Sequence, residues 1–315
     1  MLTSALAGCG GNGTESTTAA QAQQGDAGSA GEDSGNVPVG APITLTFAHG
    51  QAEGHPYQQA ALYFKELVEE ESGGSITVVV SPNGTLGDER ECVESLQMGT
   101  LDITAAVASA LSGFDPDMDV FNMPYLFESR EQAFEVLDGE VGQELFADLE
   151  SQGIKVFGTY DLGFRSMTNS QHPIETPEDC QGICIRTLES SVCVDAQENP
   201  LFTIYNSRFY EVQDYLSLTE HFYPVCPLMM SEITWNKLSP EQQVIVEDAL
   251  RKSVDYEREL AGQELETIVA DLTDAGMVVN EVDKAPFIEA VQPVYEEYRG
   301  QFGEIIDKIQ AAAKE

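Results

Sequence analysis

The chain has 315 residues, of which 15 are basic and 54 acidic, so its formal net charge is −39. This acidity excludes nucleic-acid binding, which needs a basic surface, and docking on anionic lipid through a basic patch. The length predicts about two domains, and a hydrophobic content of 42% is enough to build their cores. Because the overall field repels anions, any anion site must be made locally by arginines or backbone N–H groups.

The first 41 residues have the composition of a signal-peptide remnant and a tether. Residues 6–9 read Leu-Ala-Gly-Cys, which looks like a bacterial lipobox, so we expect Cys9 to carry a lipid that anchors the protein to a membrane. The alternative is a cysteine that follows small residues by chance. Residues 10–41 have only Val37 and Val39 as sizeable apolar side chains, and they are expected to form a disordered linker. No later stretch approaches about 18 continuous apolar residues, so no spanning helix is expected.

Residues 42–158 are predicted to form a first α/β lobe. Alternating apolar residues predict its strands, and apolar residues at three- and four-residue spacing predict its helices. One helix begins at His55-Pro56 and ends before Gly73-Gly74. The strand–helix–strand–helix–strand order predicts a mainly parallel sheet covered by helices. The predicted segments are strands 43–48, 75–80, 99–104 and 154–160 and helices 56–72, 88–98 and 131–149.

Residues 159–232 are predicted to form a second α/β lobe, and residues 233–315 to pack back on both lobes as helices. Ser239-Pro240 is a helix start signal, with serine as the cap and proline at the first helical position. No proline follows before about residue 275, so one long helix is expected there. Further segments are helices 206–215, 286–299 and 302–313 and apolar strand material over 218–230, which returns the chain.

Two arginines stand out in the second lobe. Arg165 and Arg186 lie on either side of a turn-rich segment, and each follows apolar residues that predict a strand. The planar guanidinium of arginine offers parallel N–H donors that fit a carboxylate. In a chain this poor in basic residues, the two arginines indicate a site for an acid. The alternative is a pair of ordinary ion pairs with the many acidic side chains.

A set of short motifs occurs in order between residues 43 and 312: His55-Pro56, residues 84–90 (GTLGDER), 97–102 (QMGTLD), 123–127 (MPYLF), 163–169 (GFRSMTN), 173–179 (PIETPED), 182–186 (GICIR), 197–200 (QENP), 209–212 (FYEV) and 218–221 (LTEH). This ordered set resembles the motifs of the extracytoplasmic substrate-binding proteins of TRAP transporters, the DctP-like family. The resemblance implies a two-lobed clamshell of the periplasmic-binding-protein type with a long C-terminal connecting helix. It also implies that the clamshell closes on an organic acid and hands it to a membrane permease driven by an ion gradient.

The resemblance assigns ligand-binding roles residue by residue. Arg186 matches the arginine that pairs with the substrate carboxylate, Arg165 a second pocket arginine, and Asn199 a ligand-contacting asparagine. Glu89 and Arg90 match positions where some members contact polar groups of the ligand, with a salt bridge at a helix start as the alternative. Asn199-Pro200 has a simple turn as its alternative.

The chain departs from the family between Arg186 and Asp195. Only residues 187–194 lie there, where family members have a longer segment that walls the pocket. The shortening would remove a strand-plus-helix unit, and we expect it to leave a sheet edge unpaired. A degenerate or sensory binding protein without transport is therefore an alternative function.

The sequence has no motif of nucleophilic or phosphate chemistry, such as Gly-x-Ser-x-Gly or a glycine-rich loop with lysine. The 4 histidines lack metal-ligand spacing, and we expect no metal and no cofactor. With Cys9 lipidated, the remaining cysteines cannot all pair within the chain, so most are expected to be free, with one opportunistic disulfide as the alternative. We expect a non-enzymatic, exported binding protein for a C4-dicarboxylate or sugar acid, with TRAP permease subunits as partners. A periplasmic hydrolase is the enzymatic alternative.

Overall fold

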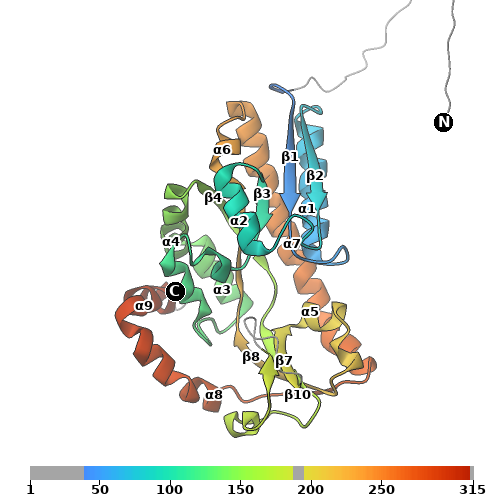
Figure 1. The fold of residues 1–315 in the computed structure, drawn as a ribbon, viewed down its shortest axis with the longest axis vertical. Coiled ribbons are helices and arrows are strands. Elements are labelled where there is room, and N and C mark those ends of the chain that lie inside the picture. Colours follow the sequence, from blue (N-terminus) through green and yellow to red (C-terminus); the bar gives the residue numbers. More distant parts are fainter. Residues whose placement is uncertain (1–38, 187–194, 313–315) are drawn as a thin grey trace, which may run out of the picture. The chain divides into compact units, whose positions relative to one another are not determined.

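The computed structural model describes residues 39–186 and 195–312. Predictions about Cys9, residues 10–38 of the linker and the shortened segment 187–194 therefore lie outside the described residues. The described chain has an α/β fold built on two five-stranded sheets, as expected for two lobes (Figure 1). None of its helices is long and apolar enough to cross a membrane.

The first sheet has the strand order β2-β1-β3-β9-β4. Its first three strands are parallel, as the alternation of strands and helices predicted, and β9 alone runs antiparallel between β3 and β4. Leu45 and Phe47 on one face of β1 are fully buried against α1 and α7. The strands are β1 (Ile43–Ala48), β2 (Ile76–Ser81), β3 (Ile103–Ala105), β4 (Ile154–Asp161) and β9 (Val225–Ser231).

Local capping signals set the ends of the helices beside this sheet. Helix α1 (Pro56–Glu71) begins after His55, whose ring nitrogen accepts from the backbone of Tyr57, and it ends before the two glycines. Helix α2 (Glu89–Met98) has a capping box formed by Asp88 and Glu91. Both helices confirm the prediction. The short elements that follow are η1 (Ala108–Leu111) and η2 (Pro116–Asn122), with α6 (Glu232–Trp235) later in the chain.

The predicted helix over 131–149 is in fact two helices, α3 (Arg130–Asp138) and α4 (Glu140–Ser151). They are separated by Gly139, which has an extended backbone. A Cβ at this position would lie 2.7 Å from the carbonyl oxygen of Glu135. Only glycine fits here, because the extended backbone at Gly139 lies so close to the last turn of α3.

The second sheet has the order β10-β8-β5-β7-β6, with β5 as the one antiparallel strand among those described. The predicted helix over 206–215 is wrong. Helix α5 (Leu201–Asn206) begins directly after Pro200 and stops before Arg208, whose φ of 56° is left-handed. The elements are β5 (Arg165–Asn169), η3 (Pro177–Cys180), β6 (Ile185–Arg186), β7 (Ala196–Pro200), η4 (Phe209–Glu211), β8 (Tyr215–Phe222) and β10 (Val278–Glu281).

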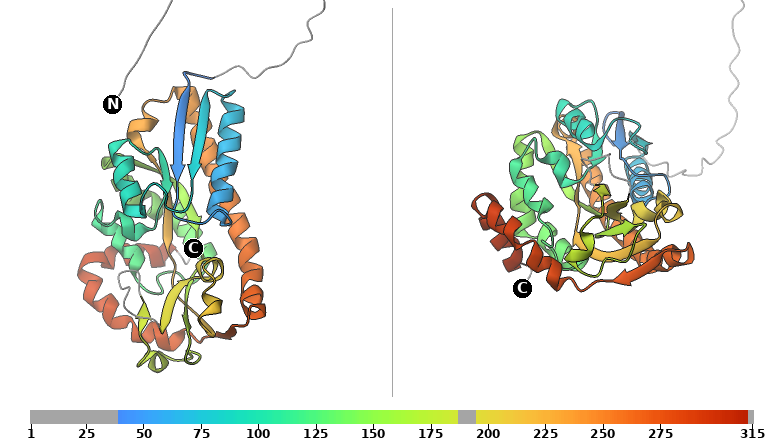
Figure 2. Two further views of the ribbon diagram at one scale, coloured as in Figure 1. Left: turned by 45° about the vertical axis from the view of Figure 1, so that its right-hand side comes forward. Right: turned by 60° about the horizontal axis from the view of Figure 1, so that its bottom comes forward.

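Two chain passages and one helix connect the two sheets. The chain passes from β4 to β5 and returns from β8 to β9, and the two passages lie side by side, with Asp161 opposite Val225 and Arg165 opposite Phe222. Residues 159–232 thus supply strands to both sheets. Helix α7 (Pro240–Asp274) has the predicted start and length and runs past both sheets (Figures 1 and 2). It packs residues 246–254 into the core of the first sheet and residues 261–272 into that of the second.

The C-terminal helices are α8 (Ala285–Ala290) and α9 (Gln292–Ala312). The sequence placed the break between residues 299 and 302, near Gly300. The structure places it at Val291, just before Pro293. Proline is tolerated in the first turn of a helix, whereas an interior glycine costs only about 1 kcal/mol, so proline decides where the new helix starts.

Candidate functional site

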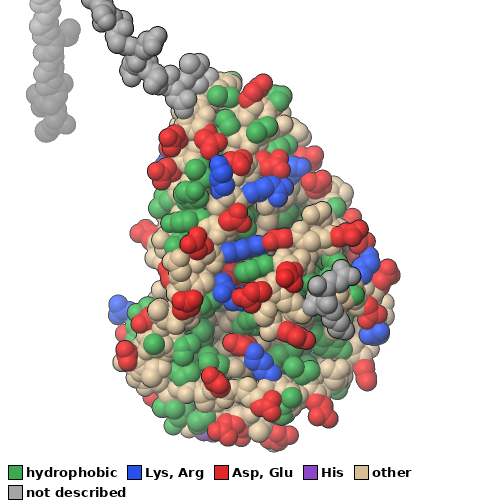
Figure 3. Space-filling view, turned by 180° about the vertical axis from the view of Figure 1, so that it is seen from behind, with side chains coloured by type: hydrophobic (Ala, Val, Ile, Leu, Met, Phe, Trp, Pro, Cys, Tyr) green, Lys and Arg blue, Asp and Glu red, His purple; other side chains and the backbone are tan. Residues whose placement is uncertain are grey.

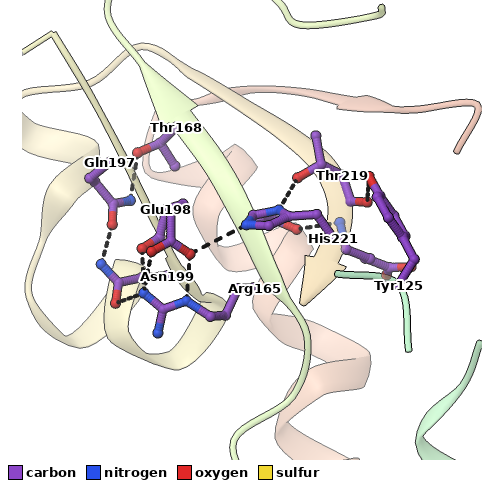
Figure 4. A network of polar contacts seen from close by, with 10 residues as sticks. Tyr125, Arg165, Thr168, Gln197, Glu198, Asn199, Thr219 and His221 are labelled. Carbon is purple, nitrogen blue, oxygen red and sulfur yellow. Dashed lines mark hydrogen bonds and ion pairs between the residues drawn. The ribbon is translucent and has the colours of Figure 1, made fainter. Parts of the chain in front are cut away.

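The candidate site is a polar network on three neighbouring strands of the second sheet (Figure 4). Arg165 is the first residue of β5, directly after the passage from the first sheet. Glu198 lies on β7 to one side of β5, and His221 lies on β8 to the other side. The network therefore sits where the second sheet begins, next to the connection between the two sheets.

The Arg165 guanidinium is buried, with 6% of the residue exposed, and it is held by a carboxylate of the protein itself. Its Nε donates to Glu198 Oε2 at 2.5 Å, and its Nη2 donates to Glu198 Oε1 at 2.8 Å. Nη2 also donates to the Glu198 carbonyl at 2.6 Å and to Asn199 Oδ1 at 3.0 Å. These bonds leave Nη1 as the nitrogen without a bond to any described residue, and they fix the plane of the guanidinium.

Glu198 is ionised in this arrangement. Burial alone would raise the pKa of its carboxyl, but hydrogen bonds from His221 and Arg165 outweigh that effect and hold the pKa below its ordinary value. His221 Nε2 lies 3.3 Å from Glu198 Oε2, and its Nδ1 is 2.9 Å from the hydroxyl of Thr219. The positive charge of Arg165 is thus neutralised within the site.

Asn199 extends the network along β7. Its amide nitrogen donates to Gln197 Oε1, and Gln197 Nε2 donates to the Thr168 hydroxyl at 2.6 Å. The Thr168 hydroxyl in turn donates to Gln213. Asn199 is therefore more than a turn residue, because its side chain connects the Arg165–Glu198 pair to a buried chain of neutral polar groups.

A loop of the first lobe is hydrogen-bonded to β8, the strand that carries His221. Tyr125, within residues 123–127, has a left-handed φ of 56°. Its backbone N–H donates to the carbonyl of His221 at 2.9 Å, and its hydroxyl donates to the carbonyl of Thr219 at 3.3 Å. Both bonds are made to β8, so this loop positions the strand that carries His221 (Figure 4).

Arg186 ends the two-residue edge strand β6 and is exposed. It pairs in parallel register with Gln197 of β7, and residues in register point to the same face of a sheet. Gln197 and Asn199 are two residues apart on one strand and also share a face, so Arg186 belongs to the Asn199 side of β7. The neighbouring Cys184 is disulfide-bonded, whereas Cys92, Cys180 and Cys226 are free.

Arg186 is also unusual in its pairing. Among the described lysines and arginines, all but Arg186 and Lys237 form an ion pair with another described residue. On the face shown in Figure 3, acidic side chains are spread among fewer basic ones. Within the described part of the chain, Arg186 is therefore an exception.

The structure does not bring Glu89 and Arg90 into this network. Glu89 Oε2 accepts from the backbone N–H of Val107 at 3.0 Å, and burial raises the pKa of its carboxyl. Arg90 is exposed on α2 and pairs with Glu94 one turn later, at 3.2 Å. Both residues therefore have partners of their own beside the first sheet. No cluster of metal-ligating side chains occurs in residues 39–186 and 195–312.

A groove of about 590 Å³ lies elsewhere, between α4, β4 and α7. Its arginines are occupied: Arg258 donates to both carboxylate oxygens of Asp138, at 2.6 and 2.9 Å, and Arg251 pairs with Glu247. Asp255 and Glu150 also line the groove. Both arginines that line the groove are therefore already paired with carboxylates of the protein.

Sequence reasoning identified Arg165 and Asn199, which the structure joins at 3.0 Å, but it gave no role to Glu198 or His221. Both residues occur in motifs that the sequence analysis quoted, residues 197–200 and 218–221. One signal could have identified Glu198: it is a carboxylate in a motif that the family resemblance places at a site for an acid. A carboxylate there would repel the ligand unless a neighbouring cation balanced its charge.

Comparisons with known proteins show the family of the chain. The family model described as "Bacterial extracellular solute-binding protein, family 7" (DctP) matches residues 47–195 and 192–301. The C4-dicarboxylate-binding protein DctB of Bacillus subtilis is 30% identical over 83% of this chain and 83% of its own length.

Two solved structures are similar over most of their length. A TRAP periplasmic solute-binding protein of a Sulfitobacter species with bound β-D-galacturonate is 32% identical, covers 87% of this chain and 100% of its own, and has a TM-score of 0.80. A TRAP protein of Sulfurospirillum deleyianum with bound succinate is 27% identical, covers 86% and 99%, and has a TM-score of 0.79. The chain therefore belongs to the DctP family, the extracytoplasmic solute-binding proteins of TRAP transporters.

Proposed function

We propose that this protein captures a small organic acid, a C4-dicarboxylate or a sugar acid, through Arg186 and delivers it to a TRAP permease in the membrane. The observation that carries the proposal is the exposed Arg186, which forms no ion pair with a described residue and lies in register with Gln197, on the Asn199 side of β7. An arginine that no carboxylate of the described residues holds can pair with the carboxylate of a ligand.

Arg165 and Asn199 support this role without competing for it. Because Arg165 is already held by Glu198, its guanidinium stays in one orientation and offers Nη1 to a ligand. Preorganised groups lose little conformational entropy on binding, which favours affinity. Glu89 and Arg90 on α2 are candidates for additional polar contacts from the first lobe. A ligand that contacts both lobes when they are closed would shift the protein toward the closed state.

The proposed protein performs no chemistry on its ligand. Its family consists of solute-binding proteins. Relatives of similar identity are a C4-dicarboxylate-binding protein and two structures with bound galacturonate or succinate. We further propose that Cys9 is lipidated and anchors the exported protein to the membrane, at the cell surface or in the periplasm, which rests on the Leu-Ala-Gly-Cys pattern and the polar tract after it.

A thermal-shift screen against dicarboxylates, uronates, aldonates and amino acids tests the proposal. At 100 times its dissociation constant, a true ligand stabilises the folded state by about 2.7 kcal/mol. Arg186→Ala should abolish this shift. Lys237→Ala is the matched control, because Lys237 is the other described cation without an ion pair to a described residue, and its removal takes the same charge from the overall field.

Three outcomes would contradict the proposal. An Arg186→Ala variant that shifts like the parent protein would refute the role of Arg186. Absence of any shift, with a normal melting transition, would favour the sensory or degenerate alternative. Turnover of a screened compound would favour a hydrolase.

A further inference from the structure

Strand β8 is irregular at the place where it enters the candidate site. It pairs with β5 at Ser217, which lies opposite Met167, and again at Phe222, which lies opposite Arg165. Between these two pairs β5 advances by two residues and β8 by five, so residues 218–221 of β8 form a bulge. Bulges redirect the side chains that they carry, and they occur preferentially beside functional sites.

Glu220, inside this β8 bulge, has a left-handed backbone with a φ of 42°. In a regular strand, the side chains two residues apart stand parallel on one face. The left-handed residue bends the chain between Thr219 and His221, and the Thr219 hydroxyl contacts Nδ1 of the His221 ring at 2.9 Å. The other ring nitrogen, Nε2, is directed at Glu198 Oε2, 3.3 Å away (Figure 4). The β8 bulge therefore gives His221 its orientation in the network.

Backbone contacts hold the β8 bulge on both sides of Glu220. The Tyr125 hydroxyl donates to the carbonyl of Thr219 at 3.3 Å, and the Tyr125 backbone N–H donates to the carbonyl of His221 at 2.9 Å. The Glu220 N–H donates to the Ser166 hydroxyl at 3.4 Å. These contacts fix the neighbours of Glu220, but they do not hold its side chain.

Lys284 holds the side chain of Glu220. It follows β10, caps α8 and forms an ion pair with the Glu220 carboxylate. Its ammonium group also lies 5.9 Å from the ring centroid of Phe164, on the passage from the first sheet to β5. The left-handed backbone is unfavourable for glutamate, whereas glycine or asparagine adopts it readily. An ion pair that fixes the direction of the Glu220 side chain therefore opposes relaxation of its backbone toward the extended form.

The orientation of His221 has consequences for the rest of the network. Burial raises the pKa of Glu198, and the hydrogen bond from His221 is the first of the contacts that outweigh this effect and lower it. Glu198 in turn holds the guanidinium of Arg165 through Nε and Nη2. Arg165 also donates to Asn199 at 3.0 Å, and Asn199 belongs to the Arg186 side of β7. A displaced His221 would thus loosen the group that connects the network to that side.

We propose that Glu220 and Lys284 are positioning residues of the ligand site. Lys284 holds the left-handed backbone of Glu220, and the β8 bulge directs His221 at the Arg165–Glu198 pair. The pair then keeps one orientation, with Nη1 of Arg165 available to an acid. The proposal rests on the proposed function, since it takes Arg165 as part of the ligand site.

NMR of the imidazole nitrogens tests the positioning role without any ligand. The chain has 4 histidines, so the His221 signals can be identified by their loss in His221→Gln. In Lys284→Ala we expect the His221 signals to move toward those of a solvated histidine. Lys308→Ala is the control, because it removes the same charge from an ion pair with Glu144, between α9 and α4, and should leave these signals in place.

Calorimetric titration with D-galactonate, D-glucuronate and succinate tests the consequence for binding. For the acid that binds most tightly, Lys284→Ala should weaken binding about threefold, the effect expected of an ion pair whose side chains are 35% and 38% exposed. Adding Glu220→Asn to Lys284→Ala should restore the affinity and the His221 signals, because asparagine tolerates the left-handed backbone without a partner. Adding Glu220→Gln should restore neither. The two double variants have the same net charge as the parent protein, so they separate backbone conformation from charge.

Each outcome decides the matter. Rescue by Glu220→Asn alone supports the positioning role. Rescue by both substitutions would show that Lys284 acts through its charge, and rescue by neither would show that it does not act through Glu220; both results overturn the inference. Unchanged His221 signals in Lys284→Ala overturn it as well. If none of the three acids binds the parent protein, the proposed function fails, and the histidine spectra alone decide whether Lys284 and Glu220 position His221.

Discussion

Arg165→Ala should destabilise the protein strongly, because it leaves the Glu198 carboxylate partly buried without its cation. The two side chains are 7% and 15% exposed, so the pair is close to the buried limit. Removing one member of a buried pair costs about 3–5 kcal/mol. We expect the lower end, about 3 kcal/mol, because His221 still contacts Glu198, and this corresponds to a fall in Tm of roughly 6–12 °C for a domain of this size.

Urea unfolding followed by circular dichroism at pH 7.5 and at pH 4 measures this loss. In the parent protein the pKa of Glu198 is lowered, so its contribution to stability is present above the unfolded pKa and is lost as the pH falls through the folded pKa. The variant lacks this contribution, so the gap between the two proteins should narrow toward pH 4. Arg90→Ala, whose side chain is 66% exposed, is the control and should stay within about 0.5 kcal/mol of the parent.

A double variant completes the test. Arg165→Ala with Glu198→Gln removes both charges, and it should recover at least about 1 kcal/mol relative to Arg165→Ala alone. If Arg165→Ala unfolds at the same urea concentration as the parent, or if the double variant recovers nothing, the pair does not hold the network in the way described.

Two further predictions concern stability elsewhere in the fold. Glu257 on α7 is fully buried, and burial, followed by the charge of Asp161, raises the pKa of its carboxyl well above the ordinary range. The folded state therefore keeps a proton on Glu257 that the unfolded state loses at neutral pH, so the free energy of unfolding falls as the pH rises above the unfolded pKa. The Glu257→Gln side chain resembles the protonated acid. In urea unfolding we expect this variant to be more stable than the parent by roughly 1–3 kcal/mol at pH 7.5, and by less at pH 4. In α4, a Cβ on Gly142 would lie 2.0 Å from the carbonyl oxygen of Leu137, so Gly142→Ala should lower the free energy of unfolding by about 2 kcal/mol or more. A Cβ on Gly300 in α9 would have nothing within 4 Å, so Gly300→Ala should raise it by about 0.5–1 kcal/mol. Melting temperatures equal to that of the parent protein would contradict both statements.

Sequence alone predicted the elements whose limits are set by neighbouring residues. Helix α7 starts at the serine cap before Pro240, and α1 starts at Pro56 and ends before two glycines, because caps and breakers act within one turn. The predictions failed where two adjacent signals compete. Gly139 divides one predicted helix in two because its backbone is extended there, so close to the carbonyl oxygen of Glu135 that a Cβ would lie 2.7 Å away.

The candidate site was only partly predictable for a related reason. Arg165 was identified by its residue type and by the family resemblance, but its partner Glu198 lies 33 residues later on another strand. Their pairing depends on the register of β5 against β7. Register follows from packing over the whole sheet and not from one motif, so the neutralisation of Arg165 could not be read from the sequence.

A crystal structure of the protein with a bound sugar acid, such as D-galactonate, would test the assignment of Arg186 most directly. We expect the ligand carboxylate within roughly 3 Å of the Arg186 guanidinium, and Arg165 still paired with Glu198. A carboxylate held by another cation, with the Arg186 side chain turned away into solvent, would contradict it.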